Sequence, residues 1–134
     1  MNDNNVFAIC RTAAGDIYIG TGCGLMRYNR QTDSFDIIPE LVGIFVYDIK
    51  EDTSGNLWLA TYVCGVFRYD VSKKEWKNYV HNEKDEKSLS NNKVLSVFED
   101  SRRNVWLTTQ ERGICLFHPE TENFTRYDLS LIHI

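Results

Sequence analysis

The sequence lacks the features that mark membrane-spanning, helical or nucleic-acid-binding proteins. No apolar run approaches the roughly 18 to 20 residues that a spanning helix needs, and no stretch shows a helical period of apolar residues. The first residues, MNDNNVFAICRT, lack the charged-then-apolar layout of a signal peptide. Basic residues number 15 against 19 acidic ones, so no basic stripe could neutralise phosphates or anionic lipids. We therefore expect contact with neither nucleic acid nor a membrane.

Residues for metal binding and catalysis are also scarce. The four cysteines, at positions 10, 23, 64 and 115, stand singly, without a CxxC pair or a histidine at ligand spacing. We expect reduced, structural thiols and no metal site. A disulfide between Cys23 and Cys64 would need Cα atoms within about 7 Å, and we do not expect one. No serine elbow, phosphate loop or metal triad appears, so we expect no catalytic residue and no cofactor.

What the sequence does contain is an eight-residue aromatic motif in three copies, which we call the phrase. SGNLWLAT at 54–61 and RRNVWLTT at 102–109 are near copies, and AGDIYIGT at 14–21 is a third. The central aromatic residues recur at intervals of 40 and 48 positions, and each copy is followed by a glycine that opens a second aromatic run. These repeated structural positions are Tyr18, Trp58 and Trp106, with Gly24, Gly65 and Gly113. A repeat of this length indicates an architecture of like supersecondary units.

Each unit contains four short apolar or aromatic runs separated by turn-forming clusters, the pattern of consecutive β-strands. In the second unit we expect strands at 45–51, 57–61, 65–70 and 76–80. The run LWLAT is apolar at successive positions, as expected when both faces of a strand are covered. Four antiparallel strands per unit of roughly 40 to 45 residues make the blade of a β-propeller. An immunoglobulin-like sandwich would not repeat its sequence. The predicted fold class is all-β, with three consecutive four-stranded antiparallel blades in an incomplete ring.

The repeats divide the chain into three predicted blades, at 5–40, 41–80 and 81–129. The third blade begins with a longer connection, 81–93, whose polar composition predicts a solvated loop. The last residues, 130–134, stop short of another repeat and are expected to be a tail that is not native sequence. Propellers close with about four to eight blades, so we interpret the chain as a fragment. Its outer blades should expose apolar surface and make it associate.

The turn before each phrase carries its own signal. Gly55 stands where a tight hairpin favours positive φ. The third copy has Arg103 at that place, which predicts either a different turn or a strain of about 1 kcal/mol. Acidic pairs recur at two strand ends, 51–52 and 99–100. Their repetition favours turn chemistry over acid–base catalysis.

These residues resemble the two-component regulator propeller repeat, whose usual form is an acidic pair, a glycine turn, LWIGT, and GL followed by RYD. The stretch EDTSGNLWLATYVCGVFRYD at 51–70 is similar throughout, and TAAGDIYIGTGCGLMRYN and EDSRRNVWLTTQERGICLFH fit with small departures. In this family such repeats form large propellers in the periplasmic sensor region of hybrid histidine kinases of Bacteroidetes, where they detect oligosaccharides.

The resemblance implies a periplasmic, non-catalytic segment that contacts neighbouring propeller blades. Its parent would bind an oligosaccharide and signal to a histidine kinase through a phosphorelay, and a dimer of the parent is compatible with this role. Two alternatives remain open. The chain could belong to a propeller enzyme of the sialidase or lyase type, or to a stand-alone protein-interaction propeller.

Ligand-binding residues are expected where the copies differ. The loops joining strands two and three emerge on the same face as the linkers between blades, and they supply the candidates Tyr62, Gln110, Glu111 and Arg112. A tyrosine can stack on a sugar, and charged groups can bind its hydroxyls; the alternative is that these are solvated loop residues. Trp58 and Trp106 are expected in the core, because every copy has an aromatic there. His81 and His118 are expected on the surface.

Overall fold

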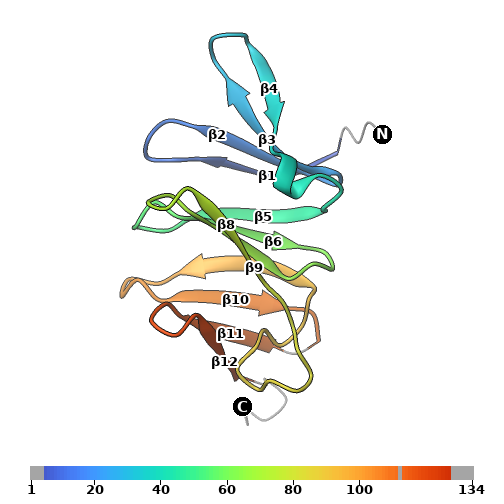
Figure 1. Ribbon diagram of the computed structural model, residues 1–134, viewed down its shortest axis with the longest axis vertical. Coiled ribbons are helices and arrows are strands. Elements are labelled where there is room, and N and C mark those ends of the chain that lie inside the picture. Colours follow the sequence, from blue (N-terminus) through green and yellow to red (C-terminus); the bar gives the residue numbers. More distant parts are fainter. Residues whose placement is uncertain (1–4, 112, 128–134) are drawn as a thin grey trace.

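The computed structural model describes residues 5–111 and 113–127 and contains three four-stranded antiparallel sheets (Figure 1). The strands are β1 (Val6–Arg11), β2 (Ile17–Thr21), β3 (Gly24–Asn29), β4 (Ser34–Ile37), β5 (Val46–Glu51), β6 (Leu57–Thr61), β7 (Val66–Asp70), β8 (Glu75–Tyr79), β9 (Val94–Glu99), β10 (Val105–Thr109), β11 (Gly113–His118) and β12 (Asn123–Tyr127). A short 3₁₀ helix, η1 (Pro39–Leu41), precedes β5. The predicted fold class is confirmed, and the strands of the second sheet lie within one residue of their expected limits. The expected tail at 130–134 lies outside the described residues.

The three sheets follow one another as blades, which we number 1 to 3 in chain order. The first strands are the innermost, since β1 contacts β5 and β5 contacts β9. Antiparallel pairing of consecutive strands places two kinds of connection at opposite ends of the blades (Figure 1). We call one end the loop face, made by residues 22–23, 38–45, 62–65, 80–93 and 110–111. We call the other the turn face, made by residues 12–16, 30–33, 52–56, 71–74, 100–104 and 119–122.

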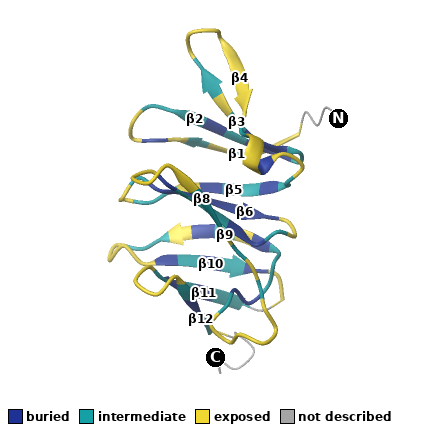
Figure 2. Ribbon diagram, viewed as in Figure 1, coloured by how far each residue is buried: buried dark blue, intermediate teal, exposed yellow. Residues whose placement is uncertain are grey.

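The core lies between the blades. All five residues of β6 are buried, because blade 1 lies on one side of this strand and blade 3 on the other (Figure 2). Trp58 is 1% exposed and packs edge-on against Phe117 of blade 3, with ring centroids 4.8 Å apart. In contrast, the equivalent Trp106 is only half-buried, since no described blade lies beyond it.

The turn of each repeated phrase has the same geometry in all three blades. An N–H at the start of the turn donates to the carbonyl four residues later, at 2.8 to 2.9 Å in each copy. Gly15 and Gly55 have φ of 92° and 87°, and Arg103 takes the same left-handed conformation, with φ of 66°. The sequence predicted either a different turn in blade 3 or strain at Arg103. The second expectation is right, because the turn is retained and Arg103 adopts the strained conformation.

The acidic pairs have two separate structural roles. The glutamate ties neighbouring blades together: Glu51 accepts the backbone N–H of Ala13 at 2.8 Å, and Glu99 accepts that of Thr53 at 3.0 Å. The aspartate that follows accepts N–H groups of its own turn, as Asp52 does from residues 54 and 56. The expectation of turn chemistry is confirmed for the aspartates. The tie between blades was not predicted.

The connection at 81–93 is a solvated loop only in part: residues 82–87 are exposed, as predicted, but residues 88–93 are not. Leu89 is fully buried, and the backbone carbonyl of Lys87 accepts the N–H of Phe124 in β12 at 2.8 Å. Arg126 of β12 donates to the carbonyl of Ser88, also at 2.8 Å. Residues 81–93 thus form a strap along the outer edge of blade 3. The prediction missed these contacts because a free sheet edge needs hydrogen-bond partners, and one leucine is enough to anchor the strap that supplies them.

The two histidines also depart from the expected surface positions. His81 has 15% of its side chain exposed, and its Nδ1 lies 2.7 Å from the carbonyl oxygen of Leu89 within the strap. His118 is half-buried, and its Nε2 lies 2.6 Å from the Thr125 hydroxyl. The His81 imidazole therefore holds the strap in shape, and the His118 imidazole links β11 to β12 within blade 3.

Two glycines with positive φ allow a test of how closely the loop face packs. Gly65 (φ 77°) and Gly43 (φ 81°) share a backbone conformation. A Cβ at residue 65 would overlap the carbonyl oxygen of Tyr79, whereas a Cβ at residue 43 would meet nothing within 4 Å. We expect Gly43→Ala to lower the free energy of unfolding by about 1 kcal/mol and Gly65→Ala by about 3 kcal/mol or more. Urea unfolding measures both, and equal losses would contradict the close packing.

The exposed outer faces predict self-association. Ile9 is 68% exposed, although its counterparts in blades 2 and 3, Ile49 and Val97, are each 6% exposed because a preceding blade covers them. Apolar surface of this kind drives association. We expect the sedimenting mass of the chain to rise with concentration and Ile9→Lys to reduce that rise. Val71→Lys, at an exposed turn residue, is the control and should leave the concentration-dependent rise in mass unchanged. A monodisperse monomer at all concentrations would contradict the prediction.

Candidate functional site

Four aromatic side chains from blades 1 and 2 meet on the loop face. We call Phe7, Phe45, Tyr47 and Tyr62 the aromatic cluster. The Tyr62 ring centroid lies 5.7 Å from those of both Phe45 and Tyr47, and Phe7 and Phe45 are 4.5 Å apart. Phe7 and Tyr62 remain 45% and 39% exposed. The Tyr62 N–H donates to the carbonyl of Phe45 at 3.0 Å, which fixes the loop against the neighbouring segment.

The cluster depends on a β-bulge repeated at the start of each innermost strand. The strand register shifts around Phe7 in β1 and around Tyr47 in β5, and β9 has the same irregularity opposite Thr108 and Thr109, near Leu95. A bulge re-aims the side chain of the extra residue. Two large residues in succession, VF, VY and VL, break the alternation of a regular strand, and this signal could have revealed the bulges.

The predicted binding residues are only partly brought together. Lys93 Nζ lies 5.2 Å from the Tyr62 ring centroid, and the Lys93 carbonyl accepts the N–H of Gln110 at 3.0 Å. Tyr62 and Gln110 thus share the loop face, and each contacts Lys93. Glu111 is exposed in a turn with φ of 71°. Arg112 lies outside the described residues.

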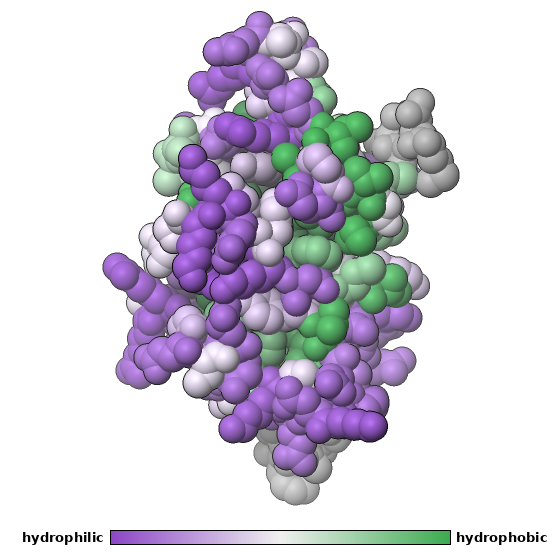
Figure 3. All heavy atoms as spheres, viewed as in Figure 1, coloured by the Kyte–Doolittle hydropathy of each residue, from purple (hydrophilic) through white to green (hydrophobic). Residues whose placement is uncertain are grey.

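The chemistry of this face suits a ligand with flat apolar surfaces and hydroxyl groups. Partly exposed rings can stack on the apolar face of a sugar, while amide and ammonium groups bind hydroxyls. Apolar atoms gather on the side of the molecule that carries the loop face, whereas the turn face is mostly hydrophilic (Figure 3). Sequence reasoning identified Tyr62 but missed Phe7, Phe45, Tyr47 and Lys93.

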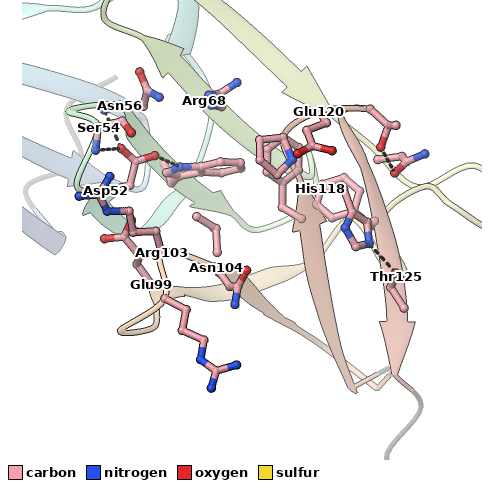
Figure 4. Close-up of a pocket in the computed structure, with 18 of the residues that line it drawn as sticks. Asp52, Ser54, Asn56, Arg68, Glu99, Arg103, Asn104, His118, Glu120 and Thr125 are labelled. Atoms are coloured by element: carbon pink, nitrogen blue, oxygen red, sulfur yellow. Dashed lines mark hydrogen bonds between the residues drawn. The ribbon is translucent and has the colours of Figure 1, made fainter.

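A second concavity lies at the opposite end, and of the predicted ligand-binding residues the described ones, Tyr62, Gln110 and Glu111, do not line it. This turn-face groove has a volume of about 720 Å³ (Figure 4). It is lined by the β5–β6 turn, Trp58 and Arg68 of blade 2, by the β9–β10 and β11–β12 turns of blade 3, and by Lys87 of the strap. In Figure 4, Asp52 and Ser54 lie on one side of the groove, and His118, Glu120 and Thr125 lie on the other.

Carboxylates of the turns are bound within the protein. Asp100 accepts the indole N–H of Trp106 and the backbone N–H groups of residues 102 and 104, each at 2.9 Å. These donors, led by the indole, lower the pKa of Asp100 to about 2. Asp52 and Trp58 form the same pair at 2.9 Å. Blade 1 has Thr12 and Tyr18 in these positions, so the carboxylate and the indole are replaced together.

Arg68 forms the inner wall of the groove. Its guanidinium lies 5.5 Å from the Trp58 ring centroid and 5.6 Å from that of Phe117, and its Nε is buried without a hydrogen-bond partner among the described residues. Its Nη1 is 3.9 Å from Glu122, which also binds Lys77. The ion pair with Lys77 is the main cause of the lowered pKa of Glu122.

Tyr79 completes this cluster of charges between blades 2 and 3. Its hydroxyl donates to Glu122 at 2.8 Å. Burial, followed by that hydrogen bond, raises the pKa of Tyr79 to about 12. The phenol therefore stays protonated at neutral pH and serves as a donor across the blade interface.

Comparison with known proteins identifies the repeat. The pattern of the two component regulator propeller family matches residues 1–22, 40–63 and 88–111, about half of the chain. The chain belongs to the two-component regulator propeller family. In the described residues, no helix is long and apolar enough to cross a membrane.

A curated relative, Histidine kinase P4 of Formosa agariphila, is 36% identical over 94 residues, which are 64% of this chain and 7% of that protein. The chain therefore spans a small part of its relative. The extracellular domain of the putative hybrid two component system BT3049 from B. thetaiotaomicron superposes with a TM-score of 0.79 at 22% identity, over 98% of this chain and 19% of that one. Virginiamycin B lyase from Staphylococcus aureus superposes with a TM-score of 0.68 at 14% identity, over 96% of this chain and 42% of the lyase chain. Likeness at such identities shows the propeller fold alone.

The indole bond to Asp100 predicts an acid-dependent stability. A carboxylate whose pKa is about 2 when folded, against 3.8 for the free side chain, stabilises the fold above pH 4, and the effect is lost as the pH falls towards 2. We expect Trp106→Phe to raise the pKa of Asp100 towards 3.8, measured by NMR titration of its carboxyl carbon. Trp76→Phe, which removes an indole that packs on Tyr69 instead, should leave it unchanged. An equal pKa of Asp100 in wild type and in Trp106→Phe would contradict the role given to the indole.

Proposed function

We propose that this chain is part of an extracytoplasmic, periplasmic ligand-sensing propeller of a hybrid two-component histidine kinase, and that its loop face detects an oligosaccharide. Family membership and the histidine kinase relative support the sensor role. The observation that carries the ligand class is the exposed aromatic cluster beside Lys93, because stacking rings next to hydrogen-bond donors are what a sugar requires.

The position of this site would make it responsive to how the blades are arranged. Phe7 comes from blade 1 and Tyr62 from blade 2, while Gln110 and the strap residue Lys93 belong with blade 3. A ligand lying on this face would contact all three blades at once. Its binding energy would then depend on their relative positions, which is the property a sensor needs.

We propose no catalysis for this segment. The carboxylates of the recurring acidic pairs, at 51–52 and 99–100, are hydrogen-bonded within turns or to the neighbouring blade. The lyase shares the fold alone, so it does not favour the enzyme alternative. In this proposal the kinase of the parent protein provides the enzymatic output, through a phosphorelay.

The test is a matched set of variants at residue 62. A glycan array selects an oligosaccharide, and calorimetry measures its affinity. We expect Tyr62→Ala to weaken binding roughly tenfold, equivalent to about 1.4 kcal/mol, because the stacking ring is lost. Tyr62→Phe keeps the ring and should keep most of the affinity.

Two further measurements make the result decisive. Phe35→Ala removes another exposed aromatic ring, from the β4 strand of blade 1, and should leave the affinity unchanged. Thermal melts should show that Tyr62→Ala folds normally, since Tyr62 is exposed. Unchanged affinity in Tyr62→Ala would exclude the aromatic cluster as the sugar site, and a parent gene without kinase and phosphoacceptor domains would exclude the sensor role.

A further inference from the structure

Three cationic side chains border the turn-face groove. Arg102 and Arg103 come from the β9–β10 turn of blade 3, and Lys87 comes from the strap. None of these three side chains forms an ion pair or a hydrogen bond within the described part of the chain. Their donor groups are therefore available to a ligand.

The turn of blade 3 differs from its counterparts at Arg103. Its φ of 66° is left-handed, and the equivalent positions of blades 1 and 2 are glycines. Other turns also hold a left-handed non-glycine residue, such as Asp33 and Lys74, so the side chain, rather than the backbone strain, distinguishes this position. In this blade the turn keeps its shape while placing a guanidinium where the other two have no side chain.

The acceptor groups of the groove are mostly occupied. Asp52 accepts the Trp58 indole and two backbone N–H groups. Both Glu99 oxygens accept the Thr53 N–H, and one also accepts the Thr53 hydroxyl. Of the lining carboxylates, Glu120 alone has no such partner among the described residues, and it is exposed at the rim. The groove thus offers many free donors and few free acceptors.

Of the two neutral amides at positions 56 and 104, one adds a donor and the other an acceptor, since Asn104 already donates its NH₂ group to Asp100 at 3.1 Å. The side-chain oxygen of Asn56 accepts the N–H of Val71 at 3.1 Å, which leaves its NH₂ group to donate. Arg68 closes the inner end between two aromatic rings, where low polarity strengthens its field. The groove lies between two blades that are both present, and its volume is in the range of small-molecule sites.

We infer that the turn-face groove is a second binding site, for a small ligand that carries a carboxylate, sulfate or phosphate group. Arg102 and Arg103 would pair with the oxyanion, since a guanidinium fork matches the geometry of all three groups. Lys87 and the Asn56 amide would bind from the other sides. This inference does not depend on the sugar site of the loop face, which lies at the opposite end of the blades.

Titration of the chain at low salt with inorganic sulfate, inorganic phosphate and citrate tests the proposal and distinguishes the three groups. Backbone NMR shifts report the affinity and place the site. We expect at least one of these anions to bind, with the largest changes at residues 56 and 102–104. The double variant Arg102→Gln and Arg103→Gln should weaken that binding roughly tenfold or more. Glutamine at 103 keeps a side chain at the left-handed position, so the turn is preserved.

A charge-matched control separates a defined site from general attraction. Arg11→Gln with Lys73→Gln removes two exposed cations that lie outside the groove and should leave the affinity unchanged. Thermal melts should match wild type for both double variants. Equal weakening by the two double variants, or no saturable shift with any of the three anions, would overturn the inference.

Discussion

A four-stranded sheet has two faces, and in this chain a face is buried only where another sheet lies against it. The strand β6, between two neighbours, is buried at every position, whereas all four residues of β4 are exposed. Trp58 shows the same dependence, since its ring is enclosed by Phe117 of the next blade. Glu51 and Glu99 align the stack, because each binds the turn of the preceding blade. Both candidate sites lie across blades and depend on this packing.

Repetition separates the parts of the blade that build the fold from the parts that differ between copies. The turn geometry is the same with glycine or with Arg103, and the bulge is similar near Phe7, Tyr47 and Leu95. The backbone therefore presents the same positions to solvent in every blade, and the side chains at those positions decide the chemistry. Aromatic rings of blades 1 and 2 fill the bulge positions on the loop face. On the turn face, blade 3 contributes arginines where blades 1 and 2 have small or neutral residues.

The sequence predicted most of the fold, because the signals for strands and turns are local and are repeated three times. The limits of β5 to β8 follow from runs of apolar residues, and the tight turns follow from Gly55 and its neighbours. The exposure of residues 82–87 was predicted, but the docking of the strap was not, because one buried leucine, Leu89, carries little weight in a segment of charged residues. The site was predicted in part: loop position identified Tyr62, but its partners Phe7 and Phe45 are 55 and 17 residues away in the chain. The pairing of β5 with β6 brings Phe45 beside Tyr62 within blade 2, and the packing of blade 1 against blade 2 adds Phe7.

The two candidate sites lie at opposite ends of the same strands. Tyr62 follows the end of β6 and Asp52 precedes its start, so the loop face and the turn-face groove are joined by a strand that is buried along its whole length. If blade 2 moves as one unit, this strand would carry a shift from one end to the other. A sugar that contacts blades 2 and 3 on the loop face and an anion that contacts the same blades in the groove would each favour one arrangement of the two blades. If both ligands favour the same arrangement, each must raise the affinity for the other by the same factor, because binding free energies are linked reciprocally.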